Sequence, residues 1–334
     1  MSEGMRAVFI RTPGGPEVLE IRDVPDPEPP FGHVRVRVHA AGVNRADLLQ
    51  RAGAYPAPPG APPDIPGLEY VGVVESVGAG VRRFSGGERV YGLVGGGAYA
   101  EKVIAHEGEV ARVPENLSDE EAGAVPEAFL TALDALLVRG RLVAGERVLI
   151  HAVGSGVGTA GVQIARALGC TVIGTSRTAD KLERCKELGM DAGVVAEKGT
   201  FADKVKEVAG GGIDVVLDLV GAAYLKDNLA VAAPRARIVC VGLTGGTQGE
   251  IDLGVLLRKR IEIVGTVIRA RELAEKIALA QLLDKTIGPW LARGMVKPVV
   301  DKVFPLGEAK EAHAYVASNA SFGKVLLDAR DARG

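Results

Sequence analysis

The chain has 334 residues, of which 47% are hydrophobic and 25% are charged, and its formal net charge is −2. This length allows two domains with separate cores, and the balanced charge with only 4% aromatic residues argues against a nucleic-acid partner. No apolar run reaches 18 residues, so no membrane-spanning segment is expected. The first residues lack a signal-peptide layout and the three cysteines lack C-x-x-C spacing, so we expect reduced thiols and a cytoplasmic protein.

The first third of the chain is predicted to be a β-rich domain. Short runs rich in β-branched residues are separated there by clusters of Gly, Pro and Asp. Val34–His39 alternates strictly between apolar and polar residues, as a half-buried strand does. The other predicted strands of this part are Arg6–Arg11, Gly67–Val77, Glu88–Gly92 and Tyr99–Ile104. Several short strands with turn signals between them indicate a barrel or a sandwich.

From about Phe129 the pattern changes to alternating helices and strands. After a helical stretch over Phe129–Val138, six apolar, β-rich runs alternate mostly with helix-length segments, which predicts a doubly wound parallel sheet of the dinucleotide-binding type. The predicted strands are Arg147–Ala152, Thr171–Thr175, Ala192–Ala196, Asp214–Val220, Arg237–Gly242 and Ile261–Thr266. The predicted helices between them are Val157–Leu168, Ala179–Leu188, Phe201–Ala209, Ala222–Ala232 and Leu253–Arg258.

The last part of the chain is too short in strands to form a domain of its own, so we expect it to return and complete the N-terminal domain. Its predicted elements are an amphipathic stretch Glu272–Arg293, a strand Val299–Phe304, a helix near Gly307–Ala317 and a strand Lys324–Asp328. The predicted division is therefore residues 1–128, 129–268 and 269–334.

A glycine-rich loop follows the first strand of the alternating part. Gly156, Gly158 and Gly161 match G-x-G-x-x-G directly between a predicted strand and a predicted helix. Such a loop turns tightly, brings backbone N–H groups close to a pyrophosphate and places it at a helix N-terminus. In a glycine-rich chain the motif alone is weak, but its position here favours dinucleotide binding.

The end of the second strand of this part indicates which dinucleotide binds. NAD-binding folds usually place Asp or Glu there to hold the ribose 2′-hydroxyl. This chain has Gly174-Thr175-Ser176-Arg177, with Lys181 one helical turn further on. Two cations in place of a carboxylate predict binding of the 2′-phosphate of NADPH; otherwise Arg177 and Lys181 are solvated charges at a helix start.

The chain as a whole resembles the zeta-crystallin-type quinone oxidoreductases of the medium-chain dehydrogenase/reductase superfamily, most of all their tumour-suppressor-inducible branch. The stretches that carry the resemblance are Ala7-Val8, Gly14-Gly15-Pro16-Glu17, Asn44-Arg45-Ala46-Asp47-Leu48-Leu49-Gln50-Arg51, Tyr55, Pro58-Pro59-Gly60-Ala61, Pro126-Glu127-Ala128-Phe129-Leu130-Thr131-Ala132, His151-Ala152, Ser155-Gly156-Val157-Gly158 and Gly323-Lys324-Val325. The resemblance implies a GroES-like catalytic domain, an inserted Rossmann domain and a cofactor between them. Members of the family commonly form homodimers by joining their Rossmann sheets edge to edge.

The resemblance also assigns residues to the site. Tyr55 is expected at the nicotinamide, with Asn44 and Asp47 near it, and these three are the catalytic candidates. The implied cofactor-binding residues are Thr131, Ser155, Gly156, Val157, Gly158, Ser176, Arg177, Lys181, Gly242, Leu243, Val267, Ile268 and Arg269. Relatives often hold the adenosine phosphate with a Tyr or His where this chain has Ala196.

No zinc site is expected. Zinc-containing relatives carry a catalytic Cys and a Gly-His-Glu motif, whereas this chain has Gly67-Leu68-Glu69 and no cysteine before Cys170. The five histidines are scattered, although zinc needs three or four converging ligands.

The expected function is NADPH-dependent, zinc-independent reduction of a quinone, since a quinone delocalises incoming negative charge without a Lewis acid. Tyr55 is expected to donate a hydrogen bond to the acceptor, or else only to pack on the nicotinamide, and Asn44 and Asp47 could equally order their loop. The alternatives are an NADPH-dependent enone or 2-alkenal reductase and a non-catalytic, crystallin-like protein that binds NADPH or RNA.

Overall fold

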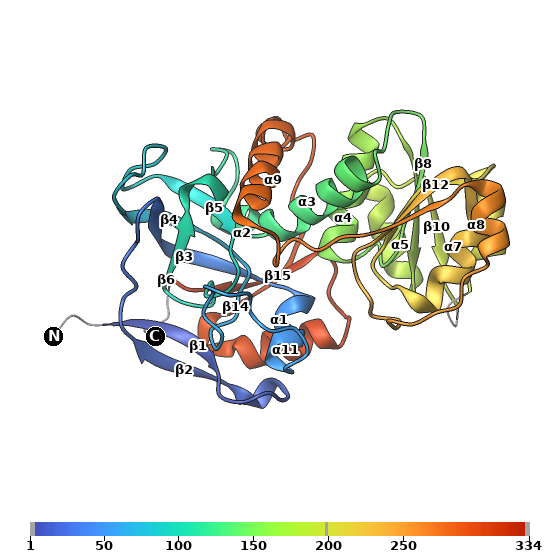
Figure 1. Ribbon diagram of the computed structural model, residues 1–334. Coiled ribbons are helices and arrows are strands. Elements are labelled where there is room, and N and C mark those ends of the chain that lie inside the picture. Colours follow the sequence, from blue (N-terminus) through green and yellow to red (C-terminus); the bar gives the residue numbers. More distant parts are fainter. Residues whose placement is uncertain (1–3, 198–199, 331–334) are drawn as a thin grey trace. The chain divides into compact units, whose positions relative to one another are not determined.

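The computed structural model describes residues 4–197 and 200–330, and the chain forms two compact units (Figure 1). Unit 1 comprises Met1–Glu127, Ile268–Gly294 and Pro298–Gly334. Unit 2 comprises Ala128–Val267 and Met295–Lys297. Unit 1 is therefore discontinuous in sequence, and the part of unit 2 before residue 268 is continuous.

Unit 2 contains a six-stranded sheet with the order β10-β9-β8-β11-β12-β13. All five neighbouring pairs are parallel. The strands are β8 Arg147–Ile150, β9 Thr171–Ser176, β10 Ala192–Val195, β11 Ile213–Asp218, β12 Ala232–Cys240 and β13 Glu262–Gly265. In order along the chain this arrangement is 3-2-1-4-5-6, the strand order of a Rossmann fold. The predicted α/β class and parallel sheet are confirmed.

Helices cover both faces of this sheet. Successive residues of a strand point to opposite faces, and in these strands the residues on both faces are apolar. Leu149 and Val216 pack in one cluster with residues of α6 and α7. The next residues along the strands, Ile150 and Leu217, face Gly161 of α4 on the other side. The helices of unit 2 are α4 Gly156–Ala167, α5 Ala179–Glu187, α6 Ala202–Ala209, α7 Leu225–Val231 and α8 Leu253–Lys259.

The helix predicted over Phe129–Val138 differs from a regular α-helix. Helix α3 spans Pro126–Leu133, and residues Asp134–Arg139 continue it as a π-helix. A π-helix widens the turn by one residue and occurs often near functional sites. The carboxylate of Asp134 is buried here and accepts a hydrogen bond of 2.5 Å from the hydroxyl of Thr266.

Unit 1 is built on a seven-stranded sheet in which β14-β15-β3-β4-β5-β7 form one path and β6 also pairs with β3. A separate antiparallel hairpin, β1 with β2, adds two more strands. The strands are β1 Met5–Ile10, β2 Leu19–Val24, β3 His33–Val43, β4 Glu69–Val77, β5 Arg89–Leu93, β6 Lys102–His106, β7 Val110–Arg112, β14 Val300–Pro305 and β15 Lys324–Asp328. The helices of unit 1 are α1 Arg45–Arg51, α2 Asp119–Gly123, α9 Leu273–Thr286, α10 Gly288–Ala292 and α11 Ala309–Ala317.

The C-terminal strands complete the N-terminal sheet. Strand β15 pairs antiparallel with β3, and β14 pairs parallel with β15, as the red and blue ribbons show (Figure 1). Apolar residues of β3 and β15 then share one core with α11. The predicted amphipathic stretch 272–293 is interrupted at Ile287, since α9 ends at Thr286 and α10 begins at Gly288-Pro289.

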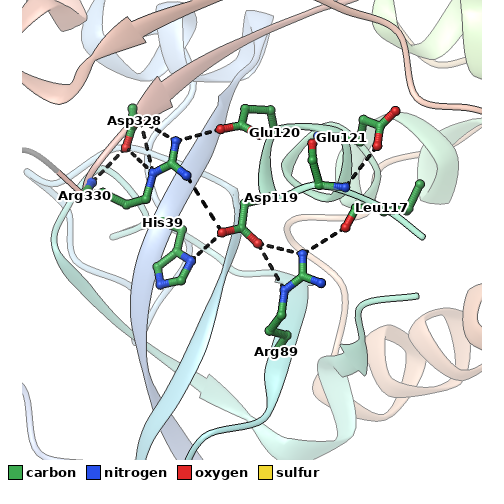
Figure 2. A network of polar contacts seen from close by, with 9 residues as sticks. His39, Arg89, Leu117, Asp119, Glu120, Glu121, Asp328 and Arg330 are labelled. Atoms are coloured by element: carbon green, nitrogen blue, oxygen red, sulfur yellow. Dashed lines mark hydrogen bonds and ion pairs between the residues drawn. The ribbon is translucent and has the colours of Figure 1, made fainter. Parts of the chain in front are cut away.

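A network of charged side chains joins α2, β3 and β5 to the residues that follow β15 (Figure 2). Asp119 lies in its centre and accepts from His39 Nδ1 at 2.6 Å and from Arg89 Nη2 at 2.7 Å. Arg330 contacts the carboxylates of Asp328 and Glu120. A single exposed ion pair contributes little to stability, so any stabilisation by this network depends on the several partners that its charges share.

No helix among residues 4–197 and 200–330 has the length and apolar character that crossing a bilayer requires.

Candidate active site

The glycine-rich loop of unit 2 lies between β8 and the N-terminus of α4. Ser155 caps this helix, and its hydroxyl accepts a hydrogen bond of 3.1 Å from the amide of Gly158. A Cβ atom at Gly158 would lie 2.4 Å from the carbonyl oxygen of Val153, so only glycine fits the turn. Ala152 has a φ of 47°, a strained value for a residue with a side chain. This tight turn at the N-terminus of a 12-residue helix suits a pyrophosphate.

The residues after β9 are those expected to distinguish the two nicotinamide cofactors. Ser176 is buried and its hydroxyl accepts from the amide of Thr178 at 3.2 Å, whereas Arg177 is exposed. Lys181 follows in the first turn of α5. The nearest carboxylate, Asp180, is held by a hydrogen bond from the Thr178 side chain, which lowers the pKa of Asp180. The Asp180 carboxylate is thus already hydrogen-bonded within the protein.

The other predicted cofactor residues of unit 2 lie on three separate segments. Thr131 is buried on α3, and Gly242 and Leu243 begin the loop after β12. A Cβ atom at Gly242 would meet the carbonyl oxygen of Leu219 at 2.8 Å, so that loop packs closely on the end of β11. Val267 is exposed after β13.

A buried polar cluster that was not predicted from the sequence lies at the carboxyl end of β8. His151 Nδ1 lies 2.8 Å from Thr175 Oγ1, and His151 Nε2 lies 2.7 Å from Asn228 Oδ1. Asn228 in turn donates to Asp218, which accepts from the amide of Gly221. Burial lowers the pKa of His151, so its ring is neutral and serves to connect the carboxyl ends of β8, β9 and β11.

In unit 1, Asn44 and Asp47 begin helix α1. The Asp47 carboxylate accepts from the amide of Asn44 at 2.8 Å, from the amide of Gly67 at 3.2 Å and from the hydroxyl of Tyr99 at 3.0 Å. Its side chain is completely buried, and this desolvation raises the pKa of Asp47 to about 6 in spite of these donors. These contacts join the start of α1 to Gly67 and to Tyr99.

The side chain of Asn44 is fixed by a buried ion pair. The Lys324 ammonium lies 2.5 Å from Glu69 Oε1 and donates to Asn44 Oδ1 at 2.6 Å. Asn44 Nδ2 donates to the same Glu69 oxygen at 2.8 Å. This closed triangle joins β15, β4 and the start of α1, and it settles which end of the Asn44 amide is the oxygen.

Tyr55 lies half-buried after α1, beside Arg269. The Arg269 guanidinium is 5.2 Å from the centre of the Tyr55 ring. Burial raises the pKa of Tyr55, and the Arg269 charge opposes that shift only in part. The phenol is therefore protonated at neutral pH and is able to donate a hydrogen bond.

Of the predicted residues of unit 1, Asn44 contacts Asp47 and Arg269 contacts Tyr55, and the Arg269 charge also lowers the pKa of Asp47 in part. Ile268 is buried next to Arg269. Five further residues support this group in the fold, and no role was predicted for them. Each is polar and buried, and a polar residue in an otherwise apolar stretch is the signal that could have identified them. They are Gln50, Glu69, Tyr99, His313 and Lys324.

The donors present do not fit a catalytic zinc ion. In the described part of the chain, no group of three or more His, Cys, Asp or Glu side chains is arranged to hold a metal. All three cysteines belong to unit 2. Beside Glu69, the positive charge is supplied by the Lys324 ammonium.

Comparisons with known proteins agree with this architecture. Residues 30–115 match the family model of the alcohol dehydrogenase GroES-like domain, and residues 156–284 match that of the zinc-binding dehydrogenases. The quinone oxidoreductase of Rattus norvegicus is 34% identical over 328 residues, which cover 97% of each chain.

Two solved structures are also similar. The Escherichia coli quinone oxidoreductase complexed with NADPH superimposes with a TM-score of 0.87 at 28% identity, over 97% of this chain and 99% of that one. A structure described as an NAD-dependent alcohol dehydrogenase has a TM-score of 0.85 at 36% identity, over 97% and 99% of the two chains.

The GroES-like and Rossmann units define an oxidoreductase with a nicotinamide-binding fold. The chain belongs to the quinone oxidoreductase family within the medium-chain dehydrogenase/reductase superfamily. Its place in the tumour-suppressor-inducible branch stays a prediction.

Proposed function

We propose that this protein is a zinc-independent, NADPH-dependent quinone oxidoreductase. The observation that carries the proposal is the triangle of Asn44, Glu69 and Lys324, in which an ammonium pairs with the only carboxylate of the Gly-Leu-Glu stretch. Without a Lewis acid, an acceptor that spreads its own negative charge is favoured over a simple ketone. The names of the full-length relatives support the same class of acceptor.

We propose that the cofactor is held by unit 2. Residues Ser155 to Gly158 would bind the pyrophosphate at the N-terminus of α4, and Arg177 and Lys181, with Ser176, would bind the 2′-phosphate. Thr131, Gly242, Leu243 and Val267 are the residues of unit 2 proposed for the nicotinamide half, and Ile268, the next residue along the chain, is proposed with them. When bound, NADPH supplies a hydride from C4 of its nicotinamide.

Tyr55 is the residue proposed to contact the acceptor. Its phenol is protonated at neutral pH, as an ordinary tyrosine is, and burial raises its pKa further, so it can donate a hydrogen bond to an acceptor oxygen on which negative charge develops. Asn44 is also proposed to orient the acceptor, and its amide is held in place by Lys324 and Glu69.

The experiment that tests the function follows NADPH absorbance with 9,10-phenanthrenequinone as acceptor and a chelator present. We expect turnover that is insensitive to the chelator and a loss of roughly tenfold or more in kcat for Tyr55→Phe. A parent rate in Tyr55→Phe would exclude the donor role. Absence of quinone turnover, with 2-alkenals reduced instead, would replace the proposal with an enone reductase.

We propose further that two copies associate through strand β13, which is an edge of the unit 2 sheet. Leu253 and Leu257 lie one helical turn apart on the neighbouring helix α8 and are both exposed, as is Ile263 on β13. A second copy of the chain would cover these residues. A cytoplasmic location remains a prediction.

A further inference from the structure

The segment that carries Tyr55 is short of hydrogen-bond donors of its own. Residues 55–66 lie between α1 and β4, outside any helix or strand, and six of these twelve residues are proline. Proline has no amide N–H, so most of the contacts that hold such a segment must come from donors elsewhere that reach its carbonyl groups.

Arg269 supplies such donors at the Tyr55 end. Its Nη1 donates to the carbonyl oxygen of Tyr55 at 3.4 Å, and its guanidinium also lies over the Tyr55 ring. Its Nε donates to the carbonyl oxygen of Gly95 at 2.8 Å. The Arg269 side chain is buried, and its guanidinium contacts the Tyr55 carbonyl oxygen, the Tyr55 ring and the Gly95 carbonyl oxygen.

Gln50 extends the contact to the other end of the segment. Arg269 Nη2 donates to Gln50 Oε1 at 2.6 Å, and Gln50 Nε2 donates to the carbonyl oxygen of Pro63 at 2.9 Å. The pair therefore touches the segment at Tyr55 and at Pro63. The end near Pro63 is also held by backbone bonds, such as the one from Ile10 N to the carbonyl oxygen of Asp64 at 2.8 Å.

We propose that Arg269 is a positioning residue for Tyr55, and that with Gln50 it forms a clamp on the proline-rich segment. The proposal deepens the proposed function and rests on it, because Tyr55 is there the group that meets the acceptor. The planar guanidinium directs its N–H groups to three acceptors, on Tyr55, Gly95 and Gln50, in a fixed fork geometry that an ammonium does not reproduce. Arg269 thus acts through Tyr55 and not as a ligand of the cofactor.

The first test is a double-mutant cycle between Arg269 and Tyr55, read as kcat and KM for 9,10-phenanthrenequinone and as the Kd of NADPH. We expect Arg269→Met to lower kcat/KM about tenfold to a hundredfold, as a displaced reacting group does, with the NADPH Kd changed less than about threefold. In the Tyr55→Phe background the same substitution is expected to have little further effect. Arg269→Lys is expected to recover part of the activity.

A second variant keeps the test valid if Arg269→Met does not fold. Gln50→Met removes only one partner of the guanidinium and is expected to give a smaller loss that is again absent in the Tyr55→Phe background. Arg89→Met is the control, since Arg89 is an arginine of unit 1 that pairs with Asp119 and donates to the carbonyl oxygen of Leu117. Equal losses with and without the Tyr55 hydroxyl would overturn the proposal, and so would a tenfold loss of NADPH affinity.

Hydrogen exchange measured by mass spectrometry separates the clamp from the reaction. Amides in the peptide that covers residues 50–66 are expected to exchange faster in Arg269→Met and Gln50→Met than in the parent or in Arg89→Met. This readout needs no turnover. Missing quinone activity in the parent would therefore refute the function alone, whereas unchanged exchange in both variants would refute the clamp.

Discussion

Two buried carboxylates lie near Asn44, and they are stabilised in different ways. Glu69 has an ammonium partner in Lys324, whereas the direct partners of Asp47 are two amides and a phenol. Neutral donors offset desolvation less completely than a paired charge does, which accounts for the pKa of about 6 at Asp47.

This pKa predicts how stability depends on pH. Because the pKa of Asp47 rises from 3.8 to about 6 on folding, the folded chain binds more protons than the unfolded chain between these values. Stability from this group is present below pH 3.8 and is lost as the pH rises through 6, by about 3 kcal/mol in all. We expect the free energy of unfolding of the parent to fall by about that amount relative to Asp47→Asn over this window.

Urea unfolding of both proteins at a series of pH values measures this difference. The comparison cancels groups that the two proteins share, such as His313, whose pKa burial lowers to about 3. A difference that stays constant between pH 4 and pH 7 would contradict the assignment.

The two cations after β9, Arg177 and Lys181, lead to a separate prediction about cofactor choice. Charged hydrogen bonds contribute about 1.5–3 kcal/mol each, so Arg177→Ala with Lys181→Ala is expected to weaken NADPH binding by about a hundredfold or more and to leave NADH binding nearly unchanged. Fluorescence titration with both cofactors measures the ratio. Arg184→Ala removes an exposed charge further along α5 and serves as the control. A parallel loss for both cofactors would show that the two cations do not read the 2′-phosphate.

Residues that act locally could be predicted from sequence, and residues that act across the fold could not. Asn44 and Asp47 are three positions apart, and the pattern of a helix start predicts that they interact. Lys324 reaches Asn44 across 280 residues, and Arg269 reaches Gln50 across 219. Nothing in the local sequence of either partner specifies such a pairing, because it depends on how the last strands return to β3.

At the scale of single elements, hydrophobic patterning identified the six parallel strands because each is a short apolar run, and the central strands β8 and β11 are buried almost throughout, whereas the edge strand β13 is largely exposed. Strands β2 and β7 were not predicted. Leu19–Val24 is largely exposed or half-buried and Val110–Arg112 has only three residues, so neither has a clear apolar pattern. The π-helix at Asp134–Arg139 was also missed, since its sequence is that of an ordinary helix.

The geometry around α4 predicts different effects on stability when two glycines of the G-x-G-x-x-G motif are replaced by alanine. At Gly158 a methyl group would collide with backbone atoms of residues 152 and 153, whereas at Gly161 it would lie 3.3 Å from the end of the Ile150 side chain, which can move. We expect Gly158→Ala to lower the free energy of unfolding by about 1–3 kcal/mol and NADPH affinity by tenfold or more. Gly161→Ala is expected to change stability by less than about 1 kcal/mol.

Thermal unfolding and NADPH titration of both variants test this prediction. If Gly158→Ala binds NADPH as the parent does, the loop is not the pyrophosphate site that we propose.

At the scale of the whole molecule, the exposed apolar residues near β13 predict a concentration-dependent dimer. Replacing Ile263 by Lys together with Leu257 by Asp places charges at the proposed interface, and we expect sedimentation at micromolar concentration to change from dimer to monomer. Val208→Asp alters an equally apolar exposed residue on α6, away from this edge, and is expected to remain dimeric. A parent that sediments as a monomer would exclude this interface.

The pairing of β15 with β3 has a consequence for synthesis of the chain. Lys324 contacts Val43 across 281 residues, and unit 2 up to Val267 is made in the interval between them. At about 5–20 residues per second the ribosome needs roughly 14 to 56 seconds for that stretch. For this time residues 40–43 of β3 lack their β15 partner, although β6 can already pair with residues 33–37, and the Rossmann unit can already fold. Nascent chains on one messenger RNA therefore expose matching strand edges to each other, and translation is the stage at which this protein is most open to mispairing.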